Sequence, residues 1–237
     1  TVAAVLIVKN EEVLLARCLD SVKDADEIIV CDTGSVDGTI EIARRYTDKV
    51  FTDFTWCDDF AAARNHAKGK ATADWILSID ADEFCQDFSK VREAVEQGFM
   101  AVNVHMYSEA NDREHFTFPR LFRNSEQVWW VKAIHNHISV LGENLGDVRI
   151  TFGYSPAHAL DPDRSLRILE REAAKPDGVR DRFYLGREYW YRRRYQEAVI
   201  KLGRYVQESG FLAEKAEAFF VMARCYWCMG MGNDARD

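Results

Sequence analysis

The first half of the chain alternates between short apolar runs and segments with helical periodicity. Residues 3–8 and 27–31 are almost continuously apolar, which is typical of parallel strands buried on both faces. Between them, apolar side chains recur at helical spacing just after the acidic pair Glu11 and Glu12. These side chains are Leu14, Leu15, Cys18, Leu19 and Val22. The pattern predicts a strand, a helix and a second strand.

The same alternation continues as far as residue 79. We expect a turn over residues 32–39, a helix through 40–43, a strand at 50–51, a helix over 60–67 and a strand over 75–79. Repeated strand and helix units of this kind predict an α/β fold with a mostly parallel, Rossmann-like sheet covered by helices. Ligands of such sheets bind beyond the carboxyl ends of the strands.

The pattern becomes wholly helical at Asp161 and Pro162, an N-cap followed by proline at the first helical position. Further on, Leu185, Gly186, Tyr189, Tyr195 and Ala198 resemble the tetratricopeptide pattern. Three of these positions recur 37 residues later, pairing Gly186 with Ala223, Tyr189 with Tyr226 and Ala198 with Ala235. We therefore expect one domain over residues 1–160 and a helical repeat region over 161–237, whose second repeat continues beyond the last residue.

The composition and the net charge indicate which classes of binding partner the sequence favours. With 237 residues and 47% apolar content, the chain can bury a core in more than one small domain. Its formal charge of -8 gives no general reason for binding nucleic acid or anionic lipid. Residues 164–204 nevertheless hold twelve Lys and Arg against six Asp and Glu. Within this stretch, Arg192 to Arg194 would favour an anionic acceptor.

The cysteines and the absence of long apolar runs bear on the cellular compartment. Six cysteines are scattered through apparent helices and strands rather than spaced as a disulfide framework. Cys225 and Cys228 form a C-x-x-C pair without a second pair, which favours structural cysteines over zinc or redox chemistry. No apolar run reaches about 18 residues, and the start lacks the pattern of a signal peptide. We expect a cytoplasmic protein without a membrane span.

Polar residues collect where the predicted strands end. Asn10 and Glu11 follow the first strand, Asp32 ends the second, and Asp80, Asp82 and Glu83 follow the strand that ends at residue 79. Acidic groups gathered at one sheet edge repel each other unless a cation or a donor-rich ligand joins them. Carboxylate oxygens favour Mg²⁺ or Mn²⁺. The D-x-D pair Asp80 and Asp82 could direct one carboxylate to a ribose and the other to a metal ion.

Three segments resemble the family 2 glycosyltransferases of GT-A fold. They are residues 4–11 (AVLIVKNE), 29–39 (IVCDTGSVDGT) and 75–83 (WILSIDADE), and they occur in the family's order within a similarity over residues 2–158. The resemblance implies transfer of a sugar from a nucleoside diphosphate, with UDP expected, and inversion at the anomeric carbon. It also implies a divalent cation, Mn²⁺ or Mg²⁺, on the diphosphate.

The resemblance also implies roles for individual residues. It places Asp80 at the ribose, Asp82 on the metal and His158 as a second metal ligand. Arg120 and Arg123 would reach phosphate oxygens, although a strand more often exposes such arginines to solvent. The full set implied for the nucleotide sugar is Val8, Asn10, Glu11, Asp32, Arg64, Asn65, Asp80, Ala81, Arg120 and Arg123.

The general base is less clearly indicated. An inverting transfer needs a group that takes the acceptor proton, and many relatives carry Glu after Ile-His or Val-His. Here Asn136 occupies that position, and an amide cannot accept the proton. His135 is our candidate, with His137 and Glu83 as alternatives, and an acceptor acidic enough to need little help from a base is a further possibility. Trp129 and Trp130 favour core packing over an aromatic wall for a ligand.

Two other functional classes stay open. A nucleotidyltransferase could use a similar sheet, although the first strand is not followed by a glycine-rich phosphate loop with lysine. A binding module whose transfer site has decayed would account for Asn136. The acceptor is not identified, and a glycan, a peptide, a metabolite or modified DNA is compatible with the sequence. The repeats could bind a protein partner or mediate self-association.

Overall fold

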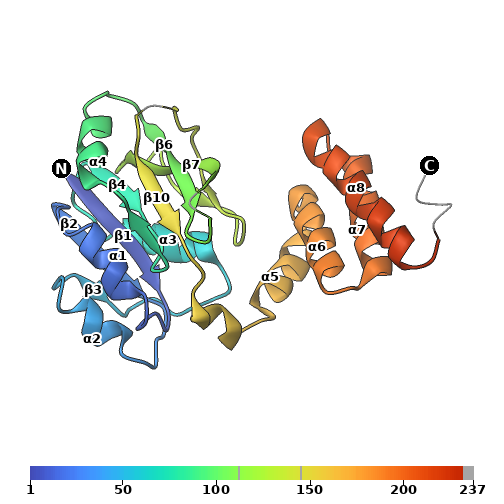
Figure 1. Ribbon diagram of the computed structural model, residues 1–237, viewed down its shortest axis with the longest axis horizontal. Coiled ribbons are helices and arrows are strands. Elements are labelled where there is room, and N and C mark those ends of the chain that lie inside the picture. Colours follow the sequence, from blue (N-terminus) through green and yellow to red (C-terminus); the bar gives the residue numbers. More distant parts are fainter. Residues whose placement is uncertain (112, 145, 232–237) are drawn as a thin grey trace. The chain divides into compact units, whose positions relative to one another are not determined.

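The computed structural model describes residues 1–111, 113–144 and 146–231 (Figure 1). The chain divides into two compact units, Thr1–Asp161 and Pro162–Asp237, with the division one residue after the expected boundary. Each unit is described separately below.

The first unit is built on one mixed sheet. Its strands, in the described residues, follow the order β3-β2-β1-β4-β7-β6-β10-β5. β3, β2, β1 and β4 are mutually parallel, β7 runs antiparallel to β4, and β6 and β10 return to the first direction before the antiparallel β5. The mostly parallel sheet is thus confirmed. The strands are β1 (Val2–Val8), β2 (Glu27–Asp32), β3 (Val50–Phe51), β4 (Trp75–Ser78), β5 (Glu83–Cys85), β6 (Ala101–Ser108), β7 (Arg113–Arg123) and β10 (Arg149–Phe152).

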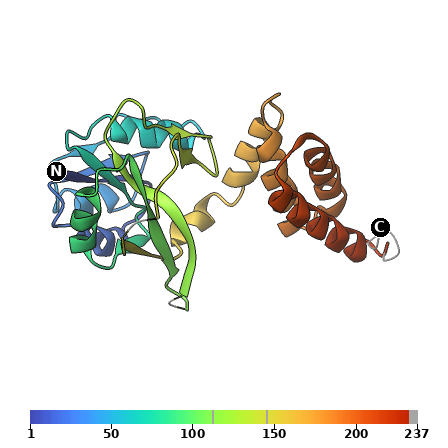
Figure 2. The same cartoon turned by 90° about the horizontal axis from the view of Figure 1, so that it is seen from above.

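Helices cover both faces of this sheet (Figures 1 and 2). Alternate side chains of β1 point to opposite faces: Leu6 belongs to one core cluster and Val5 to the other. The first cluster includes buried residues of α1 (Leu15–Ser21), α2 (Thr39–Ala43) and α4 (Phe88–Val95). The second includes Ala61 and Ala67 of α3 (Phe60–Lys68). Burial on both faces explains why β1 and β2 read as continuous apolar runs.

Two short elements complete the first unit. A two-stranded sheet pairs β8 (Trp130–Val131) with β9 (His137–Ile138) in antiparallel register. After β10, the 3-10 helix η1 (Pro156–Leu160) begins at Ser155, whose side chain accepts a hydrogen bond from the backbone N–H of Ala157. Serine at the N-cap and proline at the first helical position are typical of a helix start.

The second unit is helical throughout its described part, as expected. It consists of α5 (Arg164–Ala173), α6 (Val179–Tyr191), α7 (Tyr195–Glu208) and α8 (Leu212–Cys228). α6 packs closely on α7 at Gly186, where an added Cβ would lie only 2.5 Å from Cγ of Leu202. Only glycine permits this approach. The expected repeat position Ala235 lies outside the described residues.

Charge pairing changes the picture of the basic stretch at residues 192–194. Arg192 pairs with Glu188 at 2.7 Å and also with Asp163. Arg194 pairs with Glu197. Two of the three arginines are therefore already neutralised locally, which removes much of the reason to expect an anionic acceptor at this stretch. In the described residues, no helix is both long enough and apolar enough to cross a membrane.

Candidate active site

The parallel register of β1, β2 and β4 brings the predicted polar residues to one sheet edge. Val8 lies opposite Asp32, and Val5 lies opposite Ser78, so all three strands end at the same edge. The prediction that Asn10, Asp32 and Asp80 follow neighbouring strand ends is confirmed.

The loops after β1 and β2 are bound to each other. Asn10 has a φ of 57°; its backbone N–H donates to Oγ of Ser35 at 2.8 Å, and its Oδ1 accepts from the N–H of Val36 at 2.8 Å. Oδ1 of Asp32 accepts from the backbone of Gly34 and Ser35, each at 3.0 Å. These bonds fix both loops in place before any ligand binds. Val8 and Ala81 are buried, and the backbone oxygen of Val8 accepts from the N–H of Thr33 at 2.9 Å.

Asp80 is held between two arginines. Nη2 of Arg64 lies 2.7 Å and 3.0 Å from the two carboxylate oxygens of Asp80, so that one nitrogen contacts both oxygens. Nη2 of Arg120 donates to the same carboxylate at 3.1 Å. Burial raises the pKa of Asp80, but the charges of Arg64 and Arg120 outweigh burial and hold it well below its usual range. Asp80 is therefore an anion at any physiological pH.

Glu83 lies behind Asp80 rather than facing solvent. Its Oε2 accepts from the backbone N–H of Asp80 at 2.8 Å, and its Oε1 accepts from Nη2 of Arg120 at 3.1 Å. The residue is 4% exposed, and burial raises the pKa of its carboxyl against the pull of Arg120. With both oxygens engaged inside the protein, Glu83 is placed to position Asp80 and Arg120. It is not placed to take a proton from an acceptor, so we withdraw it as a candidate base.

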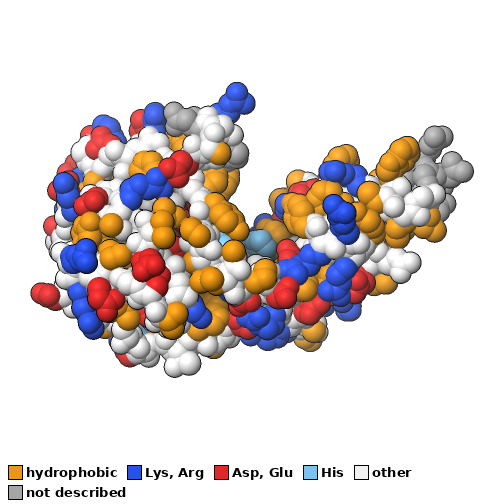
Figure 3. Space-filling view, turned by 60° about the horizontal axis from the view of Figure 1, so that its bottom comes forward, with side chains coloured by type: hydrophobic (Ala, Val, Ile, Leu, Met, Phe, Trp, Pro, Cys, Tyr) orange, Lys and Arg blue, Asp and Glu red, His pale blue; other side chains and the backbone are white. Residues whose placement is uncertain are grey.

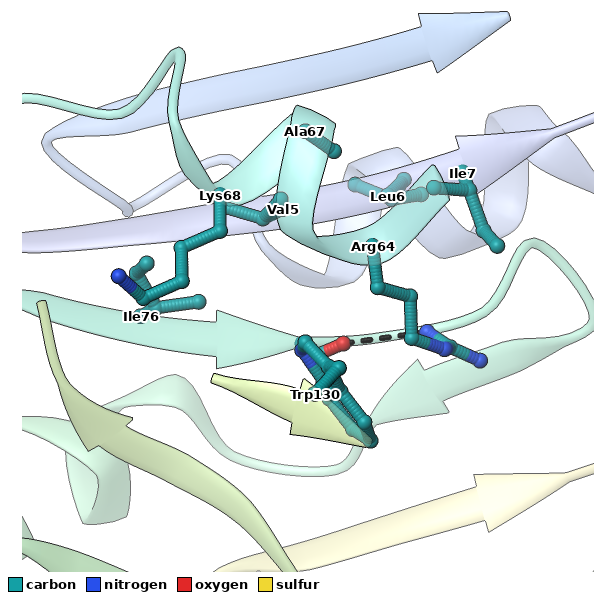
Figure 4. Close-up of a pocket in the computed structure, with 9 residues that line it drawn as sticks. Val5, Leu6, Ile7, Arg64, Ala67, Lys68, Ile76 and Trp130 are labelled. Atoms are coloured by element: carbon teal, nitrogen blue, oxygen red, sulfur yellow. Dashed lines mark hydrogen bonds between the residues drawn. The ribbon is translucent and has the colours of Figure 1, made fainter. Parts of the chain in front are cut away.

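Arg64 reaches Asp80 from α3 and is supported on three sides. The helix starts at Asp59, whose side chain caps the N–H of Ala62 at 2.9 Å. Nη1 of Arg64 donates to Oγ of Ser78 at 3.2 Å, and its guanidinium lies over the ring of Trp130, 4.9 Å from the centroid (Figure 4). Trp130 is buried in the core, as expected, whereas Trp129 is 48% exposed, so the expected core packing was wrong for Trp129. The same packing leaves little freedom for the arginine.

Asn65, the neighbour of Arg64, forms hydrogen bonds with the backbone of β8. Its amide oxygen accepts from the backbone N–H of Trp130 at 2.8 Å, and its amide nitrogen donates to the backbone oxygen of Trp130 at 2.9 Å. The side chain thus pairs with β8 as a strand would. It holds β8 against α3, and both its polar groups are used in doing so.

Asp82 and His158 lie near enough to each other for their charges to interact. Burial, and then the charge of Asp80, raises the pKa of Asp82, whereas His158 in η1 is near enough that its charge opposes the rise. The ring of Tyr154 stands perpendicular to that of His158 at 5.1 Å between centroids. The structure therefore brings together the two residues predicted to bind a metal.

Ser155, which the sequence argument missed, joins three predicted residues. Its Oγ donates to Oε2 of Glu11 at 2.6 Å, its backbone N–H donates to the carboxylate of Asp82, and its carbonyl accepts from the N–H of His158 at 3.1 Å. The Ser-Pro pair before η1 was the available signal, because it marks a helix start.

The donor set fits a divalent cation that arrives with a nucleotide. Among the described residues, no three His, Cys, Asp or Glu side chains converge as a site made by the protein alone. A carboxylate with an imidazole suits Mn²⁺, and such ions commonly take their remaining ligands from substrate phosphates. Burial, followed by the charges of Asp82, Asp80 and Asp37, raises the pKa of Glu11 to about 7 despite its bond from Ser155. This excess negative potential is what a cation would relieve.

Two predicted residues do not join this group. Arg123 lies opposite Trp75, the first residue of β4, and its guanidinium stacks over that ring at 4.5 Å. Because β7 runs antiparallel to β4, Arg123 lies beside the start of β4, whereas Asp80 follows the end of β4. The expected phosphate contact of Arg123 was therefore wrong. His135 is exposed in the loop between β8 and β9, with a φ of 47°. Its role as base stays a prediction.

Sequence comparison identifies the family. Residues 3–149 match Glycosyl transferase family 2. The chain belongs to glycosyl transferase family 2. Two relatives of this family 2 chain show in which kinds of protein similar sequences occur. It is 40% identical over 140 residues to a TPR repeat-containing protein of Synechococcus elongatus, covering 56% of the chain and 34% of that protein. It is 27% identical over 228 residues to glycosyltransferase SunS of Bacillus phage SPbeta, covering 84% of the chain and 51% of that protein. The family 2 chain thus spans between a third and about half of these relatives.

A solved structure shares the fold of this family 2 chain. Staphylococcus aureus TarS 1-349, crystallised in complex with UDP-GlcNAc, superposes with a TM-score of 0.56 at 13% sequence identity. The match covers 99% of the chain and 89% of the TarS chain. The expected GT-A fold is confirmed.

Proposed function

We propose that this chain transfers a sugar from a nucleoside diphosphate to an acceptor nucleophile with inversion at the anomeric carbon. UDP is the nucleotide that we expect. The observation that carries the proposal is that the two carboxylates of the D-x-D pair have different surroundings. Asp80 is fixed and kept ionised by Arg64 and Arg120. Asp82 lies within range of the charge of His158 and has no ion pair with an arginine or a lysine among the described residues.

Each carboxylate then has a distinct task. Asp80, ionised and rigid, accepts a hydrogen bond from a ribose hydroxyl, while Asn10 and Asp32 line the nucleoside end of the site through their fixed loops. Asp82 and His158 hold Mn²⁺ or Mg²⁺, which when bound neutralises charge on the departing diphosphate. Arg120 acts behind Asp80, since its guanidinium is already engaged with Asp80 and Glu83.

The acceptor proton requires a separate group. His135 is exposed and able to meet an acceptor, and a neutral imidazole takes a proton at physiological pH. Asn136 cannot do so. We propose His135 as the base, acting on the acceptor side of the sugar.

The relatives support this reading without fixing the substrates. SunS is named a glycosyltransferase, and TarS was crystallised in complex with UDP-GlcNAc. A glycan, a peptide, a metabolite or modified DNA remains open as acceptor. The helical unit is proposed as a tetratricopeptide-like region, and the repeat-containing relative supports this by its name alone.

Donor binding tests the proposal. Calorimetry with UDP, GDP, CDP and ADP, with and without Mn²⁺, should show metal-dependent binding of one nucleotide, UDP first. Its sugar conjugate should then be hydrolysed slowly in the absence of acceptor. Failure of all four to bind would contradict the proposal.

Asn136 favours one alternative, a module that binds the nucleotide sugar without turning it over. The same samples separate the two functions. Metal-dependent binding of UDP with no hydrolysis or transfer from any UDP-sugar would support the binding module.

A further inference from the structure

The segment between β10 and η1 carries an exposed aromatic ring that the proposed mechanism does not use. Tyr154 is 72% exposed, whereas Ser155 beside it is buried. Exposed hydrophobic side chains occur at many places on the surface shown in Figure 3, so exposure alone does not distinguish Tyr154. Its position next to the two proposed metal ligands does.

The backbone on both sides of Tyr154 is bound to Asp82. The N–H of Gly153 donates to the carbonyl oxygen of Asp82 at 2.9 Å, and the N–H of Ser155 donates to the carboxylate of Asp82. Oγ of Ser155 also donates to Glu11. Tyr154 is therefore mounted on a segment that is fixed before a ligand binds, which lowers the entropy lost when a ligand packs against the ring.

Gly153 brings this segment closer to Asp82 than another residue could. A Cβ added at Gly153 would lie 2.7 Å from Oε2 of Glu109 and 3.3 Å from the carbonyl oxygen of Asp82. Glu109 is itself held at this point, because Nη1 and Nη2 of Arg17 each donate to one of its carboxylate oxygens. The position of Tyr154 relative to Asp82 thus depends on the absence of a side chain at Gly153.

The ring of Tyr154 packs against His158. The two ring planes are perpendicular, with 5.1 Å between the centroids. A divalent cation on Asp82 and His158 would take its other ligands from the diphosphate of the donor. In such a donor the anomeric carbon is bonded to an oxygen of the second phosphate, so the sugar ring lies next to the group that the metal holds. A ring packed on His158 is therefore close to the donor sugar.

An uncharged aromatic ring suits the sugar better than the diphosphate. Phosphate oxygens are bound by cations and N–H groups. A pyranose instead presents C–H groups on its faces, and an aromatic ring packs on apolar surface of this kind. An acceptor suits the ring less well, because in an inverting transfer it approaches the anomeric carbon from the side away from the diphosphate and the metal.

We propose that Tyr154 is the platform on which the pyranose ring of the donor stacks, and that it thereby helps to determine which donor sugars bind. This inference rests on the proposed function, because that function places the diphosphate beside Asp82 and His158. Stacking on the sugar strengthens the binding of the nucleotide sugar without changing the binding of the nucleotide alone.

Calorimetry with UDP, UDP-N-acetylglucosamine and UDP-glucose, each with Mn²⁺, tests the platform on the whole 237-residue protein. Tyr154→Ala should weaken the binding of both sugar conjugates about fivefold, while the affinity for UDP changes by less than about twofold. Tyr154→Phe keeps the ring and should bind as the wild type does. Tyr191→Ala is the matched control, because Tyr191 is a tyrosine of α6 that is 60% exposed. It should leave all three affinities unchanged.

Three results would overturn the platform. They are equal losses of UDP and conjugate affinity in Tyr154→Ala, unchanged conjugate affinity in that variant, and a loss in Tyr154→Phe as large as in Tyr154→Ala. Mn²⁺ affinity, titrated on the same samples, should also stay unchanged, and its loss would show that the ring supports His158 instead.

The same samples separate this inference from the proposed function. A wild type that binds none of the three nucleotides would contradict the proposed function itself. A wild type that binds UDP with Mn²⁺ but neither conjugate, or whose variants give any of the three results, would contradict the platform alone.

Discussion

Oγ of Ser155 lies 2.6 Å from Oε2 of Glu11, so the segment that carries His158 is tied to the loop that follows the first strand. The same serine donates its backbone N–H to Asp82 and caps η1. It therefore positions both proposed metal ligands without touching the metal.

Replacing Ser155 with alanine should weaken Mn²⁺ binding. The change removes a hydrogen bond to a carboxylate and the cap of η1, which together amount to about 1.4 kcal/mol, or about tenfold in affinity. Titration of Mn²⁺ followed by electron paramagnetic resonance measures this directly. Ser155→Thr keeps the hydroxyl and should recover most of the affinity. If alanine and threonine bind Mn²⁺ as the wild type does, the serine does not position the ligands.

Removing Arg64 should destabilise the fold. Arg64→Met leaves the half-buried carboxylate of Asp80 with only Arg120, and breaking the pair with the buried Arg64 costs about 2 kcal/mol, less than for a fully buried pair. Urea unfolding of the metal-free protein gives the value. Lys90→Met breaks an exposed pair with Glu93 in α4 and should leave the unfolding midpoint unchanged. Equal effects of the two substitutions would show that the contacts of Arg64 to Asp80 carry little energy.

Stability of the metal-free protein should fall as pH rises through neutrality. The pKa of Glu11 is raised to about 7 in the folded state, so the folded protein binds a proton that the unfolded chain releases near pH 4.5. The free energy of unfolding should drop by about 2 kcal/mol between pH 5 and pH 8. Glu11→Gln should remove the part of the slope that Glu11 contributes, while the raised pKa values of Glu83 and Asp82 leave a remaining slope, and urea unfolding across the pH range measures both. A slope that is identical in the variant would assign the effect to other groups.

Turnover should depend on His135 more than donor binding does. If His135 is the base, His135→Ala lowers kcat by about a hundredfold or more while the affinity for UDP changes little. His66→Ala is the control, because His66 is a half-buried histidine of α3 that pairs with Asp53. Transfer rates and UDP calorimetry give the two quantities. A proportional loss in both would remove His135 from the chemical step.

The sequence predicted the elements of the first unit well because each is a local pattern. Continuous apolar runs gave β1 and β2, and the D-x-D pair follows β4 as expected. The direction of β7 depends instead on contacts made far along the chain, and this is why the phosphate contact expected of Arg123 was wrong. Arg120 was also predicted to reach a phosphate, but its guanidinium pairs with Asp80 and Glu83. Asn65 was expected to contact the nucleotide sugar, and Glu83 was expected to take a proton. Each instead bonds to a residue that is distant in sequence, Trp130 for Asn65 and Arg120 for Glu83, and local patterns do not indicate such contacts. The sequence around Ser155 indicated only the start of a helix, and this pattern does not predict the hydrogen bond between Ser155 and Glu11.

The most direct test of the central claim is UDP binding with and without Mn²⁺ in the wild type, Asp82→Asn and His158→Ala. Asparagine keeps the size of the side chain and removes its charge, so the fold is preserved while the proposed metal ligand is weakened. We predict that Mn²⁺ strengthens UDP binding to the wild type at least tenfold, and that both substitutions abolish this gain while the metal-free affinity stays the same. A wild-type protein whose UDP affinity is indifferent to Mn²⁺, or variants that keep the full gain, would contradict the account.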